Sequence, residues 1–149
     1  MTKNSVTIVM VEDDEGHARL IEKNIRRAGV NNEIRHFTDG TTALRYLLDA
    51  PEGPSHNGPA LVLLDLNLPD MSGTDILTRM KESSGPLRRT PVVVLTTTDD
   101  KIEIQRCYDL GANVYITKPV NYESFAQAIR QLGLFLSVIQ LPDPLGDGH

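Results

Sequence analysis

Three short apolar runs constrain the fold of this chain most strongly. They are VTIVMV at residues 6–11, ALVLL at 60–64 and PVVVL at 91–95. None of them alternates between apolar and polar residues, so each predicted strand needs apolar cover on both faces, which is typical of parallel sheets packed between helices. Two shorter runs, EIRHF (33–37) and VYI (114–116), bring the number of predicted strands to five.

Helical patterns separate these runs, so that strands and helices alternate along the chain. The predicted helices occupy residues 15–29, 39–50, 73–83, 99–112 and 121–141. Gly29 is expected to end the first helix, while Asp99 or Asp100 caps the fourth helix and Gly111 ends it. Five strand–helix units predict an α/β doubly wound fold. Loops rich in proline, glycine or serine are expected at 51–59 and 83–90.

Length and charge exclude several classes of protein. A chain of 149 residues predicts one domain, which we place at residues 1–141, with a disordered tail at 142–149 and no output domain. With 15 Lys and Arg against 20 Asp and Glu, the net charge of −5 argues against a binder of nucleic acid or of anionic membranes. The lone Cys107 excludes an internal disulfide and fits a reducing compartment. Without a long apolar run or a signal region, we expect a cytoplasmic protein.

Carboxylates and hydroxyls follow the predicted strands at the edge where a parallel sheet binds ligands. Asp65 comes directly after the third run, and Lys118 lies in a polar segment after the fifth. The remaining members of this group are the acids Glu12, Asp13 and Asp14 and the hydroxyl residues Thr96, Thr97, Thr98 and Thr117. Several carboxylates in one pocket repel each other, so the group calls for a divalent cation, and oxygen ligands favour Mg²⁺.

Each member of this group also has an ordinary structural explanation. An acid after a strand is often only a helix cap, and Asp14 or Glu15 is expected in that role. A threonine at a strand end is commonly a cap as well, and Lys-Pro is a common turn dipeptide. Each of these signals is weak alone, and their joint placement at the ends of the right strands carries the prediction of a site.

Four sequence blocks resemble the receiver domain of bacterial two-component response regulators. They are IVMVEDDE, LVLLDLNLPDMSG, PVVVLTT and GANVYITKPV, and they occur in order over roughly residues 5–140. The resemblance implies a flavodoxin-like, five-stranded parallel sheet in the order 2-1-3-4-5 with five helices. The segments TTTDD, YITKPVNYESF and FLSVIQLP further resemble the stand-alone regulators that are paired with cyanobacterial and bacterial phytochromes.

The resemblance assigns roles to the acidic residues. Asp65 aligns with the residue that accepts the phosphoryl group. Glu12 and Asp13 align with the acidic pair that holds Mg²⁺, Asp13 directly and Glu12 through water. Asn67 is expected to give its backbone carbonyl to the metal.

The resemblance also implies how the phosphoryl group is contacted and how a signal follows. Lys118 aligns with the lysine that contacts the phosphoryl group, and its bond to Pro119 is expected to be cis. Thr96 aligns with the switch hydroxyl and Tyr115 with the switch aromatic residue. The expected protein is therefore not an enzyme acting on other substrates. It is expected to catalyse its own phosphorylation and a slow autodephosphorylation.

Partners are implied in the same way. The expected donor is a phosphohistidine on a sensor histidine kinase, with phytochromes the first kinases to consider, and output is expected through protein contact or as a phosphorelay intermediate. The end of the last predicted helix carries a second apolar face. Because an apolar face needs cover, we expect a homodimer contact there, although the tail could instead fold back on its own domain. The dimer residues would be Leu134, Phe135, Val138 and Leu141.

Three alternatives remain open from the residues. An aspartyl-nucleophile phosphatase would need a second acid at position 67, where Asn67 stands. A flavodoxin-like FMN protein would have to bind phosphate beside EDDE, which repels it unless a metal is present. A receiver-shaped interaction module that works without phosphorylation would not need the complete set of Asp13, Asp65, Thr96 and Lys118.

Residues outside this group are given ordinary roles. His17, His36, His56 and His149 have no metal-ligand spacing and are expected on the surface or in packing. We expect Asp70 to be only solvated and Cys107 to be half-buried.

Overall fold

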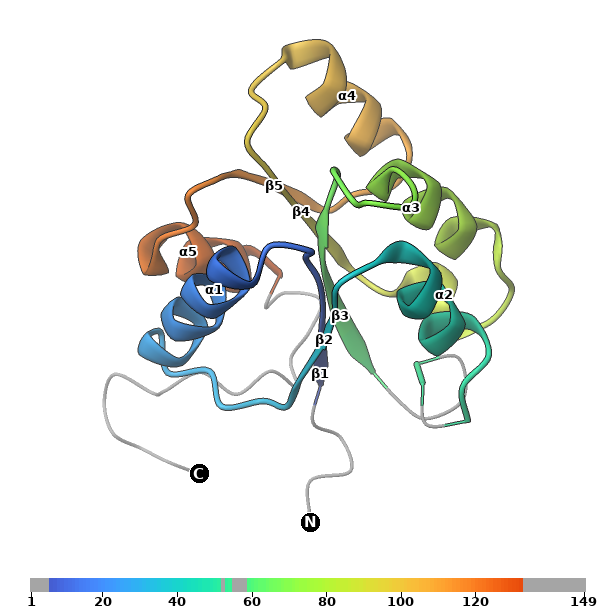
Figure 1. Ribbon diagram of the computed structural model, residues 1–149, viewed down its shortest axis with the longest axis horizontal. Coiled ribbons are helices and arrows are strands. Elements are labelled where there is room, and N and C mark those ends of the chain that lie inside the picture. Colours follow the sequence, from blue (N-terminus) through green and yellow to red (C-terminus); the bar gives the residue numbers. More distant parts are fainter. Residues whose placement is uncertain (1–5, 52, 55–58, 133–149) are drawn as a thin grey trace.

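The computed structural model describes residues 6–51, 53–54 and 59–132. Its centre is a five-stranded sheet in the order β2-β1-β3-β4-β5, and every neighbouring pair of strands is parallel (Figure 1). This confirms the strand order that the resemblance implies. The strands are β1 (Thr7–Val11), β2 (Ile34–Phe37), β3 (Ala60–Asp65), β4 (Val92–Thr96) and β5 (Val114–Thr117).

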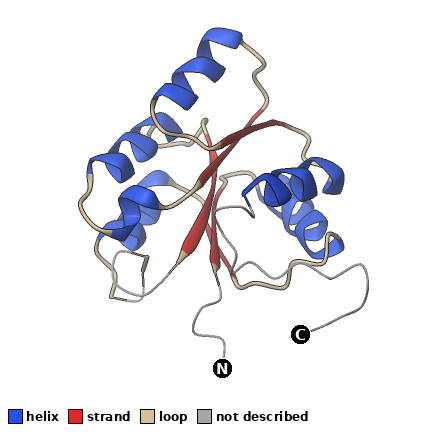
Figure 2. Ribbon diagram, turned by 180° about the vertical axis from the view of Figure 1, so that it is seen from behind, coloured by secondary structure: helices blue, strands red, loops and turns tan. Residues whose placement is uncertain are grey.

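Helices cover both faces of the sheet, as the view from behind also shows (Figure 2). α1 and α5 pack on one face, and α2, α3 and α4 lie over the other. Five helices between and after five strands confirm the doubly wound architecture. The helices are α1 (Glu15–Arg27), α2 (Gly40–Leu48), α3 (Gly73–Glu82), α4 (Lys101–Asp109) and α5 (Tyr122–Leu132).

Two hydrophobic cores explain why the apolar runs do not alternate. Along β1, Ile8 and Met10 face the core under α1 and α5, whereas Val9 and Val11 face the core under α2 and α3. All four side chains are buried because both faces are covered. Every residue of β3 is buried as well. The lack of alternation in the apolar runs thus indicates a sheet that helices cover on both faces.

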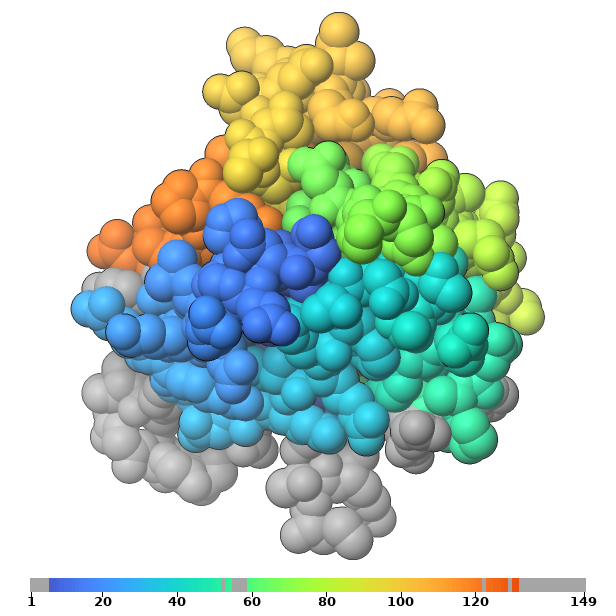
Figure 3. All heavy atoms as spheres, in the orientation of Figure 1, coloured from blue at the N-terminus to red at the C-terminus, as the bar shows by residue number. Residues whose placement is uncertain are grey.

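α4 is the helix that is least embedded in the sheet. Cys107 is its only buried residue, and Ile102 at its start is 80% exposed. In Figure 3 the gold atoms of α4 project beyond the rest of the molecule. The complete burial of Cys107 corrects our expectation of a half-buried side chain, because Cys107 packs into the core on this face of the sheet.

The expected loop at 83–90 contains a short 3-10 helix, Pro86–Arg89. It forms because Pro86 suits a first helical position and because Leu87 is fully buried. α5 is described as far as Leu132, so the predicted end of the last helix and all four predicted dimer residues lie outside the described residues. No helix in the described parts of the chain is long and apolar enough to cross a membrane.

Candidate functional site

Three carboxylates meet at the carboxyl ends of β1 and β3. One oxygen each from Glu12, Asp13 and Asp65 lies within 4.8 Å of the others. Glu12 and Asp65 are buried, whereas Asp13 is exposed. Asp65 lies more than fifty positions after Glu12 and Asp13 in the chain, and the parallel pairing of β1 with β3 brings the three to one edge of the sheet.

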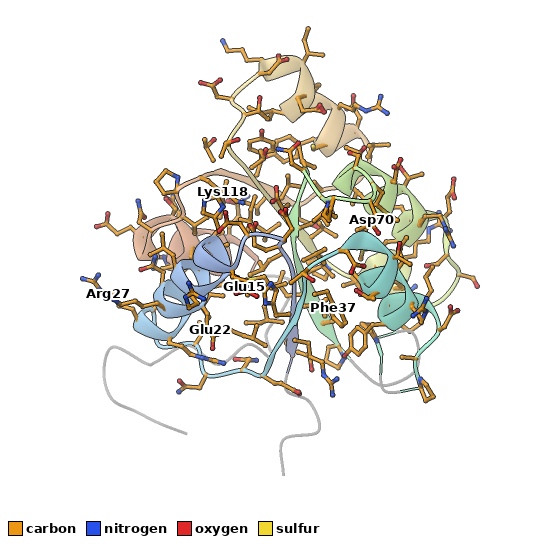
Figure 4. All side chains as sticks on the ribbon, in the orientation of Figure 1. Glu15, Glu22, Arg27, Phe37, Asp70 and Lys118 are labelled. Carbon is orange, nitrogen blue, oxygen red and sulfur yellow. The ribbon has the colours of Figure 1, made fainter. Side chains whose placement is uncertain are left out.

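Lys118, which follows β5 and is labelled in Figure 4, contacts two of these acids. Its Nζ lies 2.5 Å from Oε1 of Glu12 and 3.2 Å from Oδ2 of Asp65. The side chain is only 7% exposed, so both contacts are largely shielded from water. The peptide bond between Lys118 and Pro119 is cis, as the resemblance implies.

The carboxylates outnumber the ammonium group, and this imbalance suits a cation. Burial raises the pKa of Glu12, and the hydrogen bond from Lys118 opposes that rise. The charge of Asp65 raises the pKa of Glu12 further. Oxygen-only donors with excess negative charge are the ligand set of a hard divalent cation such as Mg²⁺.

Asp65 itself is held by the loop that follows β3. Its Oδ1 accepts a hydrogen bond of 3.1 Å from the backbone N–H of Asn67. Asn67 also forms an isolated antiparallel bridge with Ser72, which closes the loop at its base. Gly73 begins α3 so close to the strand that a Cβ there would lie 2.3 Å from the carbonyl oxygen of Asp65. Glycine is therefore required at the exit of this loop.

Thr96 and Tyr115 stand on the neighbouring strands β4 and β5. Thr96 is the last residue of β4 and is fully buried. Tyr115 of β5 donates a hydrogen bond of 2.6 Å from its hydroxyl to the backbone carbonyl of Thr98, in the segment between β4 and α4. Burial raises the pKa of Tyr115 to about 12. The two predicted switch residues are thus linked to the same segment, because the Thr98 N–H also lies 3.4 Å from Oγ1 of Thr96.

A family model described as the response regulator receiver domain matches residues 8–130, which is most of the chain. The chain belongs to this family. A solved receiver domain from Rhodospirillum rubrum is 73% identical, with a TM-score of 0.73 and coverage of 92% of this chain and 97% of that one.

Two regulators with nearly the same length as this receiver domain extend the comparison. Response regulator Rcp1 of Synechocystis is 32% identical over 136 residues, which cover 91% of this chain and 92% of Rcp1. Its Mn²⁺-bound structure is 31% identical, with a TM-score of 0.68 and coverage of 93% and 99%. The phosphorylated cyanobacterial phytochrome response regulator RcpA is 36% identical, with a TM-score of 0.72 and coverage of 93% and 99%.

Sequence reasoning missed two residues that support Lys118 in this receiver domain. His17 was expected on the surface or in packing, yet its Nδ1 lies 3.3 Å from Lys118 Nζ and 3.8 Å from Oε2 of Glu12. Asn24 is buried in α1 and donates a hydrogen bond of 2.8 Å to the carbonyl of Val120. His17 lies in the first turn after the cap at Asp14, a position from which its approach to the strand ends could have been inferred.

Asp70 also differs from its expected role as a solvated acid. Its two carboxylate oxygens accept hydrogen bonds from the backbone N–H groups of Gly40 and Thr41, and the Thr41 hydroxyl donates a third. These bonds hold the pKa of Asp70 at about 2. No local sequence signal reveals this contact, because its partners lie about thirty positions earlier in the chain.

Proposed function

We propose that this receiver domain accepts a phosphoryl group from a sensor histidine kinase onto Asp65. The observation that carries the proposal is the position of Asp65, a buried carboxylate beside the ammonium of Lys118 and two further acids. RcpA, which is 36% identical, has been solved in a phosphorylated form, and this supports the proposal by similarity.

Mg²⁺ is the cofactor that the site is proposed to use. The carboxylates of Glu12, Asp13 and Asp65 and the backbone carbonyl of Asn67 would hold it. The bound cation would supply positive charge that lets an anionic phosphoryl group approach the acids. The Mn²⁺-bound form of Rcp1 supports a divalent cation by similarity.

The transfer is an in-line displacement at phosphorus. A carboxylate oxygen of Asp65 forms the new P–O bond, the bond from phosphorus to the imidazole nitrogen of the donor breaks, and its electron pair stays on that nitrogen. Lys118 already contacts Oδ2 of Asp65, so its ammonium is in place to bind oxygens of the arriving group. The hydroxyl of Thr96 is proposed to bind another of these oxygens.

A cavity of about 150 Å³ lies beside Lys118, and its lining does not include Asp65. His17 and Leu20 of α1 line it on one side, and Thr97, Lys118 and Pro119 line it on the other. Phytochrome-type histidine kinases are the proposed donors, because the relatives include a phytochrome response regulator.

The signal is proposed to pass from Thr96 to Tyr115. If Thr96 moves towards the phosphoryl oxygens, the bond between the Tyr115 hydroxyl and the Thr98 carbonyl is the contact that would rearrange. Output then follows by protein contact or as a phosphorelay step. A homodimer through the predicted contact residues at 134–141 remains part of the proposal, and light scattering after size exclusion tests it.

Phosphorylation of the purified chain tests the central claim. The wild type, Asp65→Asn and the control Asp75→Asn are each incubated with Mg²⁺ and acetyl phosphate. We expect the wild type and Asp75→Asn to gain one base-labile phosphoryl group by intact mass, and Asp65→Asn to gain none. Asp75 is an exposed acid in the first turn of α3, so it controls for the loss of one charge. A wild type that gains no such group would favour an interaction module that works without phosphorylation.

A further inference from the structure

We propose that Asp70 is a positioning residue for the metal ligands of this site. By binding the N-terminus of α2, it holds the loop after β3, residues 66–72, in the conformation that presents the Asn67 carbonyl, and so sets the affinity for Mg²⁺. This inference rests on the proposed function, because it concerns the cation that phosphorylation of Asp65 would use.

The contact between Asp70 and α2 is extensive for an exposed side chain. Oδ1 lies 2.8 Å from the N–H of Gly40, and Oδ2 lies 2.8 Å from the N–H and 2.5 Å from the hydroxyl of Thr41. Both carboxylate oxygens are therefore engaged by one helix terminus. The first N–H groups of a helix have no partner within the helix and carry partial positive charge, so a carboxylate is a favourable ligand for them. Figure 4 labels Asp70 beside α2.

α2 already has a local cap, and this separates the role of Asp70 from ordinary capping. Asp39 precedes the helix, and its Oδ1 accepts hydrogen bonds from the N–H and the hydroxyl of Thr42 at 2.7 and 2.8 Å. Asp70 binds the N–H groups of Gly40 and Thr41, which Asp39 does not bind, and it does so from the loop that follows β3. Its bonds thus join two segments, whereas those of Asp39 stay within one.

The loop that carries Asp70 is fastened at its base and at its tip. At the base, Asn67 bridges to Ser72, and the N–H of Gly73 donates a hydrogen bond of 2.9 Å to the carbonyl of Leu66. At the tip, Asp70 binds α2, and the next residue, Met71, packs so closely on Gly40 that a Cβ there would lie 2.5 Å from its Cγ. The contact with α2 is therefore what holds the tip in place.

The same loop carries the proposed metal ligand. Asn67 donates its N–H to Oδ1 of Asp65, so the peptide groups around Asn67 are oriented relative to the phosphoacceptor. If the tip were released, only the bridge to Ser72 and the bond to Asp65 would hold Asn67, and the direction of its carbonyl would be less tightly fixed. Groups that orient a metal ligand commonly change metal affinity by about 10- to 100-fold.

Paired substitutions at Asp70 and Asp39 test the inference. Asp70→Ala and Asp39→Ala each remove one negative charge and one acid at the α2 N-terminus, but only the former releases the loop. Mg²⁺ is titrated into ¹⁵N-labelled protein, and its affinity is taken from the shifts of the backbone amides. We expect affinity about tenfold weaker for Asp70→Ala, an intermediate loss for Asp70→Asn, and a change within about twofold for both Asp39→Ala and Asp39→Asn.

Hydrogen exchange without any metal gives an independent readout. The amide of Gly73 should exchange at least about threefold faster in Asp70→Ala than in the wild type, and at the wild-type rate in Asp39→Ala. If Asp70→Ala keeps the wild-type affinity for Mg²⁺, or if Asp39→Ala loses as much affinity as Asp70→Ala, the proposed role of Asp70 is overturned while the proposed cofactor stands. A wild type that binds no Mg²⁺ would overturn this inference together with the proposed cofactor.

Discussion

Lys118 and Glu12 form a buried ion pair that joins the ends of β5 and β1. Nζ lies 2.5 Å from Oε1, and the two side chains are 7% and 0% exposed. A buried pair of this kind is costly to break, because the remaining partner keeps its charge without compensation. Lys118 therefore stabilises the acids of the site, and it is also the group proposed to bind the phosphoryl oxygens.

Lys118→Met should destabilise the protein strongly, and Mg²⁺ should restore part of the loss. Removing the ammonium leaves Glu12 and Asp65 unpaired, which is expected to lower the free energy of unfolding by about 3 kcal/mol. A divalent cation on the acids would replace the missing charge. Urea unfolding of the variant with and without Mg²⁺ measures both effects. Lys101→Met, at the exposed start of α4, is the control. Equal destabilisation of Lys118→Met with and without Mg²⁺ would contradict the proposed replacement of the lysine charge by the cation.

Asn24→Leu should weaken the support of the segment that carries Lys118. The substitution leaves the Val120 carbonyl without its 2.8 Å hydrogen bond, at a cost of about 1–3 kcal/mol. We also expect slower phosphorylation by acetyl phosphate, because Val120 follows Lys118 by two residues. Chemical unfolding and the rate of phosphoryl uptake check this, with Asn31→Leu in an exposed position as the control. A variant that loses stability yet keeps the wild-type rate would show that Asn24 serves the fold alone.

Tyr115→Phe should remove the bond to the Thr98 carbonyl while keeping the ring. The expected loss is about 0.5–1.5 kcal/mol in the free energy of unfolding. Hydrogen exchange should accelerate in the segment between β4 and α4, because that bond ties this segment to β5. Tyr108→Phe is the matched control, since Tyr108 is 42% exposed on α4. Unchanged exchange in Tyr115→Phe would argue against Tyr115 as a restraint on this segment.

The stability that Asp70 contributes should disappear in acid. Hydrogen bonds from the Thr41 hydroxyl and the Gly40 amide hold its pKa at about 2 in the folded protein, below the ordinary value of 3.8. The unfolded chain therefore takes up this proton first as the pH falls, and the contribution present above pH 3.8 is lost towards pH 2. The difference in unfolding free energy between wild type and Asp70→Asn should shrink over that window. A difference that stays constant from neutral pH to about 2 would contradict it.

Much of the fold could be predicted because the apolar runs and caps are local signals. The runs at 6–11, 60–64 and 91–95 lack alternation, and the structure confirms that all three are buried on both faces apart from the half-buried Thr7. Asp100 caps α4, and Gly111 has a positive φ of 110° beyond its end, as predicted. The 3-10 helix at Pro86–Arg89 was not predicted, because the buried contact of Leu87 is a tertiary one.

The contacts of the candidate site also divide into those that the sequence predicts and those that depend on tertiary packing. Strand ends lie at one edge of a parallel sheet, so the meeting of Asp65 with Glu12 and Lys118 follows from their places after the strands. The contacts of His17 with Lys118 and of Asn24 with Val120 were not predicted, because they depend on how α1 lies against the segment between β5 and α5.

The sequence alone determined the architecture, the family and the identity of the proposed phosphoacceptor, because periodicity, caps and strand-end acids are properties of neighbouring residues. Only the tertiary structure decided that Asp70 binds α2 and that Lys118 is shared between Glu12 and Asp65. Those contacts join residues that are from about thirty to more than a hundred positions apart. Their strength depends on distance and burial in the folded chain, which no local pattern of residues encodes.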